Sequence, residues 1–115
     1  MKEEKKNLIV ELTFNFALKI IEYVEILENK KKYSMANQLI RSGTSIGSNV
    51  REAQSAESRA DFIHKLKISD KEAEETEFRL QLCQHSKNYP DCDYLITDLE
   101  IIKRVLGKII STSKK

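Results

Sequence analysis

The chain has 115 residues, of which 33% are charged and 40% hydrophobic, and its formal net charge is +2. This length encloses one core and leaves no room for separate catalytic and regulatory units, so we expect a single domain over residues 1–115. Only 3 Gly and 1 Pro are present, which argues against a β-rich fold and predicts an all-α protein.

The first predicted helix spans residues 7–28 and is apolar on two sides. Only one side can face the core of a small bundle, so the other is available to a neighbouring subunit. The short polar turn that follows, residues 29–32, predicts an antiparallel second helix. The two stripes at helical spacing are Leu8, Leu12, Phe16, Ile20, Tyr23 and Leu27 on one side, and Val10, Phe14, Leu18, Ile21 and Val24 on the other.

The second predicted helix spans residues 33–57 and carries Gly43 and Gly47 on its apolar face. Each Gly costs about 1 kcal/mol relative to Ala inside a helix, so close approach of another backbone is the expected compensation. Two polar stripes flank that face. We expect the first to face solvent: Asn37, Arg41, Thr44, Ser48, Arg51 and Ser55. The second is mostly small and uncharged and lets another helix approach closely: Gln38, Ser42, Ser45, Asn49, Glu52 and Ala56.

The third predicted helix opens at Ser58, where the spacing to Asp61 fits a capping box, and runs to His85. It has an inner face and a second contact surface around Phe78 and Leu82. Pro90 breaks the helical pattern, and a fourth helix with one apolar face follows over residues 91–110, before a tail that we expect to be frayed. Four helices with short connections predict an antiparallel up-down-up-down four-helix bundle.

The sequence predicts no catalytic, cofactor or metal site. Cys83 and His85 are two residues apart, so they do not face the same way on a helix and cannot jointly bind one ion. A carboxylate-bridged metal bundle needs Glu-x-x-His pairs, which the chain lacks. No nucleophile elbow is predicted, because the Gly-x-Ser-x-Gly spacing at residues 43–47 lies inside a predicted helix and not at a strand-to-helix turn. No phosphate-binding glycine loop occurs, so we expect no enzyme.

Charge is segregated along the chain although the net charge is small. Residues 30–67 contain eight basic and three acidic side chains, residues 101–115 contain five basic and none acidic, and residues 70–77 contain five acidic and one basic. The sequence shows no recognition helix or aromatic stacking platform, so basic residues would neutralise phosphates without reading bases. The candidate nucleic-acid contacts are Lys30, Lys31, Lys32, Arg41, Arg51 and Arg59.

The stretch from Gln38 to Ala53 and the later motifs Asp61-Phe62, Leu66-Lys67-Ile68-Ser69 and Lys71-Glu72-Ala73-Glu74-Glu75-Thr76 resemble a bacterial four-helix bundle family. This family was first noticed in intervening sequences of 23S ribosomal RNA genes. The resemblance implies a ring-like homopentamer without enzymatic activity. The accessory proteins of diversity-generating retroelements are similar, and there a basic pentamer binds nucleic acid and the reverse transcriptase. The family's characteristic polar positions, which we expect to be structural, correspond to Ser42, Ser45, Asn49, Glu52 and Glu75.

We therefore expect a non-enzymatic, homo-oligomeric scaffold, a pentamer, that binds RNA or DNA or a nucleic-acid-handling protein. The alternative is a protein-interaction adaptor that uses the Glu-rich third helix and binds no nucleic acid, and a third class is an unrecognised hydrolase. The N-terminus shows no secretory signal pattern, and no apolar run reaches the ~20 residues of a membrane span. A cytoplasmic protein that makes no membrane contact and needs no cofactor is the expectation.

Overall fold

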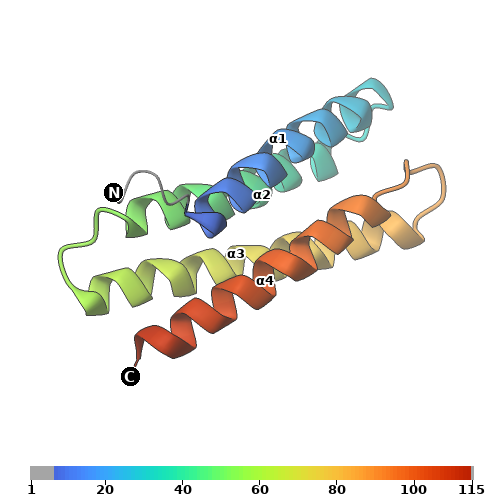
Figure 1. The fold of residues 1–115 in the computed structure, drawn as a ribbon. Coiled ribbons are helices and arrows are strands. Elements are labelled where there is room, and N and C mark those ends of the chain that lie inside the picture. Colours follow the sequence, from blue (N-terminus) through green and yellow to red (C-terminus); the bar gives the residue numbers. More distant parts are fainter. Residues whose placement is uncertain (1–6, 115) are drawn as a thin grey trace.

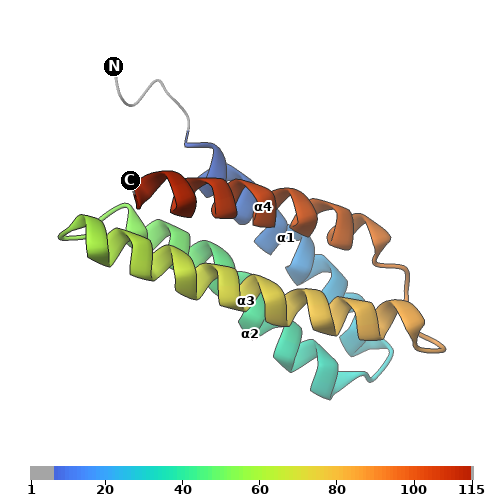
Figure 2. The same cartoon turned by 90° about the horizontal axis from the view of Figure 1, so that it is seen from below.

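The computed structural model describes residues 7–114, which form four helices (Figure 1). Successive helices run antiparallel, so the α1–α2 and α3–α4 turns lie at one end of the bundle and the α2–α3 turn at the other (Figures 1 and 2). Helices α1 and α3 each pack against α2 and α4 and lie diagonally opposite each other. The predicted all-α four-helix bundle is confirmed. The helices are α1 (Leu8–Asn29), α2 (Tyr33–Ala53), α3 (Arg59–His85) and α4 (Asp93–Ser113).

The core lies along the axis between the four helices, where each helix buries one apolar stripe. Complete burial of each large aliphatic or aromatic side chain contributes about 1.5–3 kcal/mol. The bundle is therefore held mainly by this stripe and not by helix propensity. The largest fully buried side chains are Phe16, Ile20, Tyr23, Leu27, Leu39, Ile46, Leu66, Leu80, Leu95, Leu99, Ile102 and Leu106.

Two glycines of α2 allow α1 to approach closely, as the sequence predicts. A Cβ atom added at Gly43 would lie 2.9 Å from Cγ1 of the buried Ile20. At Gly47 the added atom would lie 3.3 Å from the backbone carbonyl oxygen of Thr13. Any side chain at position 43 or 47 would therefore push the two helices apart.

The second helix ends earlier than expected, at Ala53 and not at residue 57. Beyond it the amides of Gln54, Ser55 and Ala56 bond to carbonyls three residues back, so the chain tightens out of the α-helical pattern. Ser58 then adopts an extended conformation and its Oγ accepts a hydrogen bond of 3.0 Å from the Asp61 amide. This bond caps α3 at the predicted place.

The fourth helix differs from the prediction at both ends. It begins at Asp93, two residues later than expected, because Cys92 occupies the N-cap position and its carbonyl accepts from the Leu95 and Ile96 amides. It ends at Ser113, so residues 111–113 are helical and not frayed. Packing of Ile109 and Ile110 against the core stabilises this last turn.

The predicted single domain spans residues 1–115, of which residues 1–6 and 115 lie outside the part of the chain that the structure describes. None of the helices in residues 7–114 combines the length and apolarity that crossing a bilayer requires.

Candidate interaction surfaces

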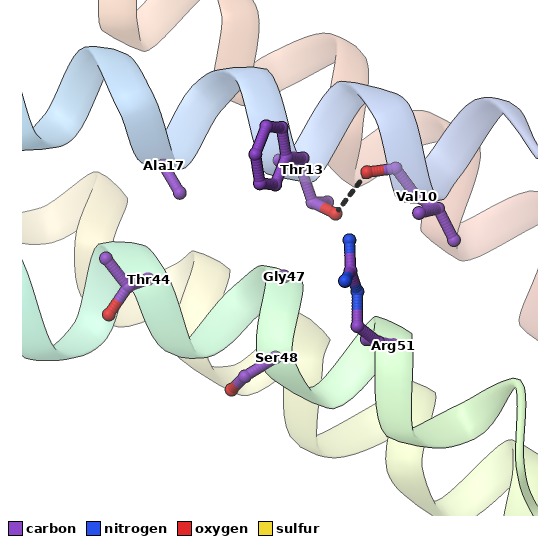
Figure 3. A pocket seen from close by; sticks show the side chains of 8 residues that line it. Val10, Thr13, Ala17, Thr44, Gly47, Ser48 and Arg51 are labelled. Carbon is purple, nitrogen blue, oxygen red and sulfur yellow. Dashed lines mark hydrogen bonds between the residues drawn. The ribbon is translucent and has the colours of Figure 1, made fainter.

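An apolar groove of about 240 Å³ lies between α1 and α2 (Figure 3). Gly47 leaves its floor open, and the Arg51 guanidinium reaches across from α2 toward α1, with Cζ 5.9 Å from the centroid of the Phe14 ring. We call this surface the α1–α2 groove. It is lined by Val10, Thr13, Phe14, Ala17, Thr44, Gly47, Ser48 and Arg51.

The walls of the α1–α2 groove are apolar because its polar groups bond elsewhere. The Thr13 hydroxyl donates to the Ile9 carbonyl oxygen at 2.8 Å, and the Thr44 hydroxyl donates to the Ile40 carbonyl oxygen at 2.6 Å. Phe14 is 52% exposed, and Leu18 and Ile21 continue the exposed apolar stripe along α1. Phe14, Leu18 and Ile21 of the predicted second apolar side are therefore uncovered in the protomer, whereas Val24, which was predicted to lie on the same side, is buried in the core.

The stripe of α2 that was expected to face solvent is largely exposed, with Thr44 alone half-buried. Its members Thr44, Ser48 and Arg51 also line the wall of the groove opposite α1. The reason is the close approach at Gly47, which brings α1 beside this stripe. Helix periodicity gives the angular spacing of stripes but not which neighbouring helix covers each one.

A second exposed apolar surface lies on α3. Phe78 is 61% exposed and Leu82 is 42% exposed, one helical turn apart on the side facing away from the buried Leu80. Gln81 and His85 lie beside them. We call this surface the α3 ridge. Because α1 and α3 occupy diagonal positions, the groove and the ridge face different sides of the molecule.

The stripe of small polar residues on α2 lies against α3, as its composition predicts. The Thr76 hydroxyl donates to Ser42 Oγ at 3.0 Å, and the Ser69 hydroxyl donates to the Ile46 carbonyl oxygen at 2.8 Å. Ser42, Ser69 and Thr76 are all fully buried. These bonds satisfy polar groups that would otherwise destabilise the core.

Charged side chains bridge α2 and α3 at the edge of the same contact. Glu75 accepts from Arg41 at 3.5 Å and from Arg79 at 3.2 Å, and Lys65 pairs with Glu52 at 3.0 Å. These carboxylates therefore act within the protomer. Exposed pairs of this kind contribute only about 0–1 kcal/mol each.

Ser45 and Asn49 make hydrogen bonds within their own helix. The Ser45 hydroxyl donates to the Arg41 carbonyl oxygen at 2.6 Å, and the Asn49 amide donates to the Ser45 carbonyl oxygen at 2.9 Å. Neither bond reaches α3, so these two side chains support their own helix and do not bridge to the next one.

The six basic residues predicted to contact nucleic acid do not form one patch. Lys30, Lys31 and Lys32 lie in the α1–α2 turn, whereas Arg59 opens α3 at the opposite end of the bundle. The 21 residues of α2 put about 30 Å between these ends. Arg41 pairs with α3 carboxylates and Arg51 covers the groove, so the lysine turn is the one cluster among the six.

Three further ion pairs tie α4 to its neighbours, and sequence reasoning did not find them. Lys103 of α4 lies 2.9 Å from a Glu74 oxygen and 2.7 Å from a Glu77 oxygen of α3. Lys19 of α1 lies 2.7 Å from an Asp98 oxygen of α4. In the sequence, each of these charged residues stands beside an apolar stripe, but that position does not show which residue it pairs with.

The buried titratable groups lie together beneath the α3–α4 turn. Burial raises the pKa of the Cys92 thiol to about 11 and also raises the pKa values of Cys83 and Tyr23. A thiol with a raised pKa holds little reactive thiolate near neutral pH. Within residues 7–114, no three His, Cys, Asp or Glu side chains are grouped so that they could hold a metal ion.

The fold and these surfaces define a small antiparallel four-helix bundle with an exposed apolar groove on one side and an apolar ridge on another. Residues 5–108 match the family model of the 23S rRNA-intervening sequence protein, and the chain belongs to this family. No curated protein matches the chain. The chain is similar to a crystal structure of a protein of unknown function from the S23 ribosomal protein family of Bacteroides thetaiotaomicron. That similarity has a TM-score of 0.85 and 40% identity, and covers 89% of this chain and 97% of the other.

Proposed function

We propose that the chain is a non-enzymatic subunit of a homo-oligomeric ring, a pentamer, that binds nucleic acid without sequence preference. One observation carries the proposal of a ring. Phe14 and Phe78, two large and mostly exposed aromatic side chains, centre apolar surfaces that face different sides of the same protomer. Exposed apolar patches on small proteins are typically contact sites.

Two different surfaces on one chain favour a head-to-tail contact. When the ridge of one copy fills the groove of the next, the first and last copies keep one free groove and one free ridge until the chain of contacts closes. A ring is the closed form of that arrangement. The number of five subunits follows from the family resemblance.

Both surfaces have the composition of an interface. Arg51 crosses the α1–α2 groove beside Phe14, and Phe78 and Leu82 form the α3 ridge. Aromatic and Arg side chains are enriched at the energetic centres of protein interfaces.

The nucleic-acid part of the proposal rests on the lysine turn. A ring repeats Lys30, Lys31 and Lys32 once per subunit, so a small cluster becomes a larger basic surface. Binding of this kind depends on released counterions and weakens steeply as salt rises. Titration with RNA and DNA at two salt concentrations tests it, and failure to bind either at low salt would favour the adaptor function instead.

The ring is tested with two single variants, Phe14→Glu in the groove and Phe78→Glu on the ridge. Each variant keeps one intact surface, so we expect each alone to be monomeric and an equimolar mixture to form a dimer and nothing larger. Ile101→Glu, at an exposed apolar residue of α4, is the matched control and should assemble normally. Analytical ultracentrifugation reads the mass, and circular dichroism checks that each variant is folded. An unmodified protein that stays monomeric at every concentration would refute the proposed ring.

A further inference from the structure

Two turns far apart in the sequence meet at one end of the bundle. The Lys32 ammonium lies 4.9 Å from the centroid of the Tyr89 ring, which joins the α1–α2 turn to the α3–α4 turn. Beside Lys32, Tyr33 is 57% exposed. We call this surface the lysine–tyrosine end. It consists of Lys30, Lys31, Lys32 and Tyr33 from the first turn and Lys87 and Tyr89 from the second.

Both turns are held by hydrogen bonds to the bundle. The Tyr23 side chain is fully buried and its hydroxyl donates to the Pro90 carbonyl oxygen at 2.8 Å, which fixes the residue after Tyr89. The Lys32 amide donates to the Leu27 carbonyl oxygen at 2.8 Å and closes the first turn. Because the backbone is fixed, binding would order side chains only, which lowers its entropic cost.

Charge alone does not explain what this end could bind. Lys30, Lys31 and Lys87 are exposed, but the exposed carboxylates of Glu28 and Asp91 lie in the same two turns. The local excess of positive charge is therefore modest. The exposed Tyr33 ring beside the lysines supplies a second kind of contact, because every nucleobase has a face that can stack on an aromatic ring. The Tyr89 ring is partly buried against the core and lies under the Lys32 ammonium, so its role is to position that lysine.

We infer that the lysine–tyrosine end binds single-stranded nucleic acid, with lysines on the phosphates and a base stacked on Tyr33. This inference rests on the proposed nucleic-acid function and adds the class of ligand. Bases within a duplex are paired and stacked on each other, so their faces are closed to this ring.

The test compares oligo(dT) and oligo(rU) single strands with a blunt DNA duplex by fluorescence anisotropy on the full chain. The variant Tyr33→Leu should lower single-strand affinity by about tenfold, because the stacked base contributes appreciably. Duplex affinity should stay unchanged. Tyr33→Phe keeps the aromatic face and should bind single strands as tightly as the unmodified chain. Quenching of tyrosine fluorescence by the single strand gives an independent readout of stacking.

The outcomes separate this inference from the function on which it rests. If Lys30→Glu/Lys31→Glu/Lys32→Glu abolishes binding while the Leu variant binds normally, phosphate contact stands and stacking is wrong. Equal affinity of the unmodified chain for duplex and single strand would also overturn the inference. If the unmodified chain binds neither, the nucleic-acid function fails together with it. Comparison of oligo(dT) with oligo(rU) tells whether DNA or RNA is preferred.

Discussion

The hydroxyl groups of Thr76 and Ser42 form a hydrogen bond of 3.0 Å between α3 and α2, and both side chains are fully buried. Thr76 Oγ1 also lies 2.8 Å from the Glu72 carbonyl oxygen in its own helix. The Thr76 hydroxyl group therefore makes polar contacts both within α3 and with α2. This pair lies at the centre of the α2–α3 contact and makes its register sensitive to either residue.

Removing either partner of this pair should destabilise the fold, and removing both should cost less than the sum. Ser42→Ala should lower the free energy of unfolding by about 1 kcal/mol, because Thr76 keeps its bond to Glu72. Thr76→Val should cost about 1–3 kcal/mol, because it leaves the Ser42 hydroxyl buried without this partner. Urea unfolding of the two single variants and the double variant measures the coupling. Strict additivity would show that the hydrogen bond contributes nothing.

Glycine positions 43 and 107 should respond to alanine in opposite directions. A Cβ at Gly43 meets the buried Ile20, so we expect Gly43→Ala to destabilise by about 1–3 kcal/mol through overpacking. Nothing lies within 4 Å of a Cβ at Gly107 in α4, so Gly107→Ala should stabilise by about 1 kcal/mol through helix propensity. Thermal unfolding of both variants checks the pair, and a Gly43→Ala protein as stable as the unmodified chain would contradict the close approach of α1.

Stability should fall at alkaline pH because of the buried thiol of Cys92. Its pKa rises from an ordinary 9.0 to about 11 on folding, so above pH 9 the unfolded chain loses a proton that the folded chain retains. The free energy of unfolding should be level below pH 8 and fall by on the order of 2 kcal/mol between pH 9 and 11. Cys83 and Tyr23, whose pKa values are also raised, act in the same direction.

Cys92→Ala is the variant that isolates this effect. It should unfold with a shallower dependence on pH than the unmodified chain when both are measured in reducing buffer from pH 7 to 10.5. Its stability at neutral pH should be somewhat lower, because the fully buried Cys92 side chain fills core volume. Identical pH profiles for the two proteins would mean that the Cys92 thiol is not protected from ionisation by the fold.

Arg41 and the lysine turn should differ in their effect on nucleic-acid binding. Arg41 lies 3.5 Å from Glu75 and 3.8 Å from Glu72, so its charge is already balanced by α3. Arg41→Ala should leave both affinity and salt dependence unchanged, whereas Lys31→Ala should lower affinity and reduce the salt slope by about one ion. Anisotropy titrations at several salt concentrations give both quantities. A salt slope that falls with Arg41→Ala would place phosphate on the α2–α3 face.

Local periodicity was sufficient to predict the helices and their inward faces. Leu39, Ile46 and Val50 recur at helical spacing, and all three are buried. Ser58 was recognisable as a cap because capping depends on residues three apart. Gly43 and Gly47 indicated a close backbone contact because glycine inside a helix needs such a compensation. The ends of α2 and α4 were less accurate, because they depend on Cys92 and on bonds three residues back at 54–56.

The sequence by itself thus determined the number, order and inner faces of the helices, since these follow from spacing within one turn or two. Only the tertiary structure decided what the outer stripes meet. It placed Arg51 across the α1–α2 groove, paired Arg41 with Glu75, and brought Lys32 to Tyr89. Helical spacing fixes the angle between stripes, whereas their partners depend on how each helix is rotated and how closely it packs. Those quantities are set jointly by all four helices, and no single segment encodes them.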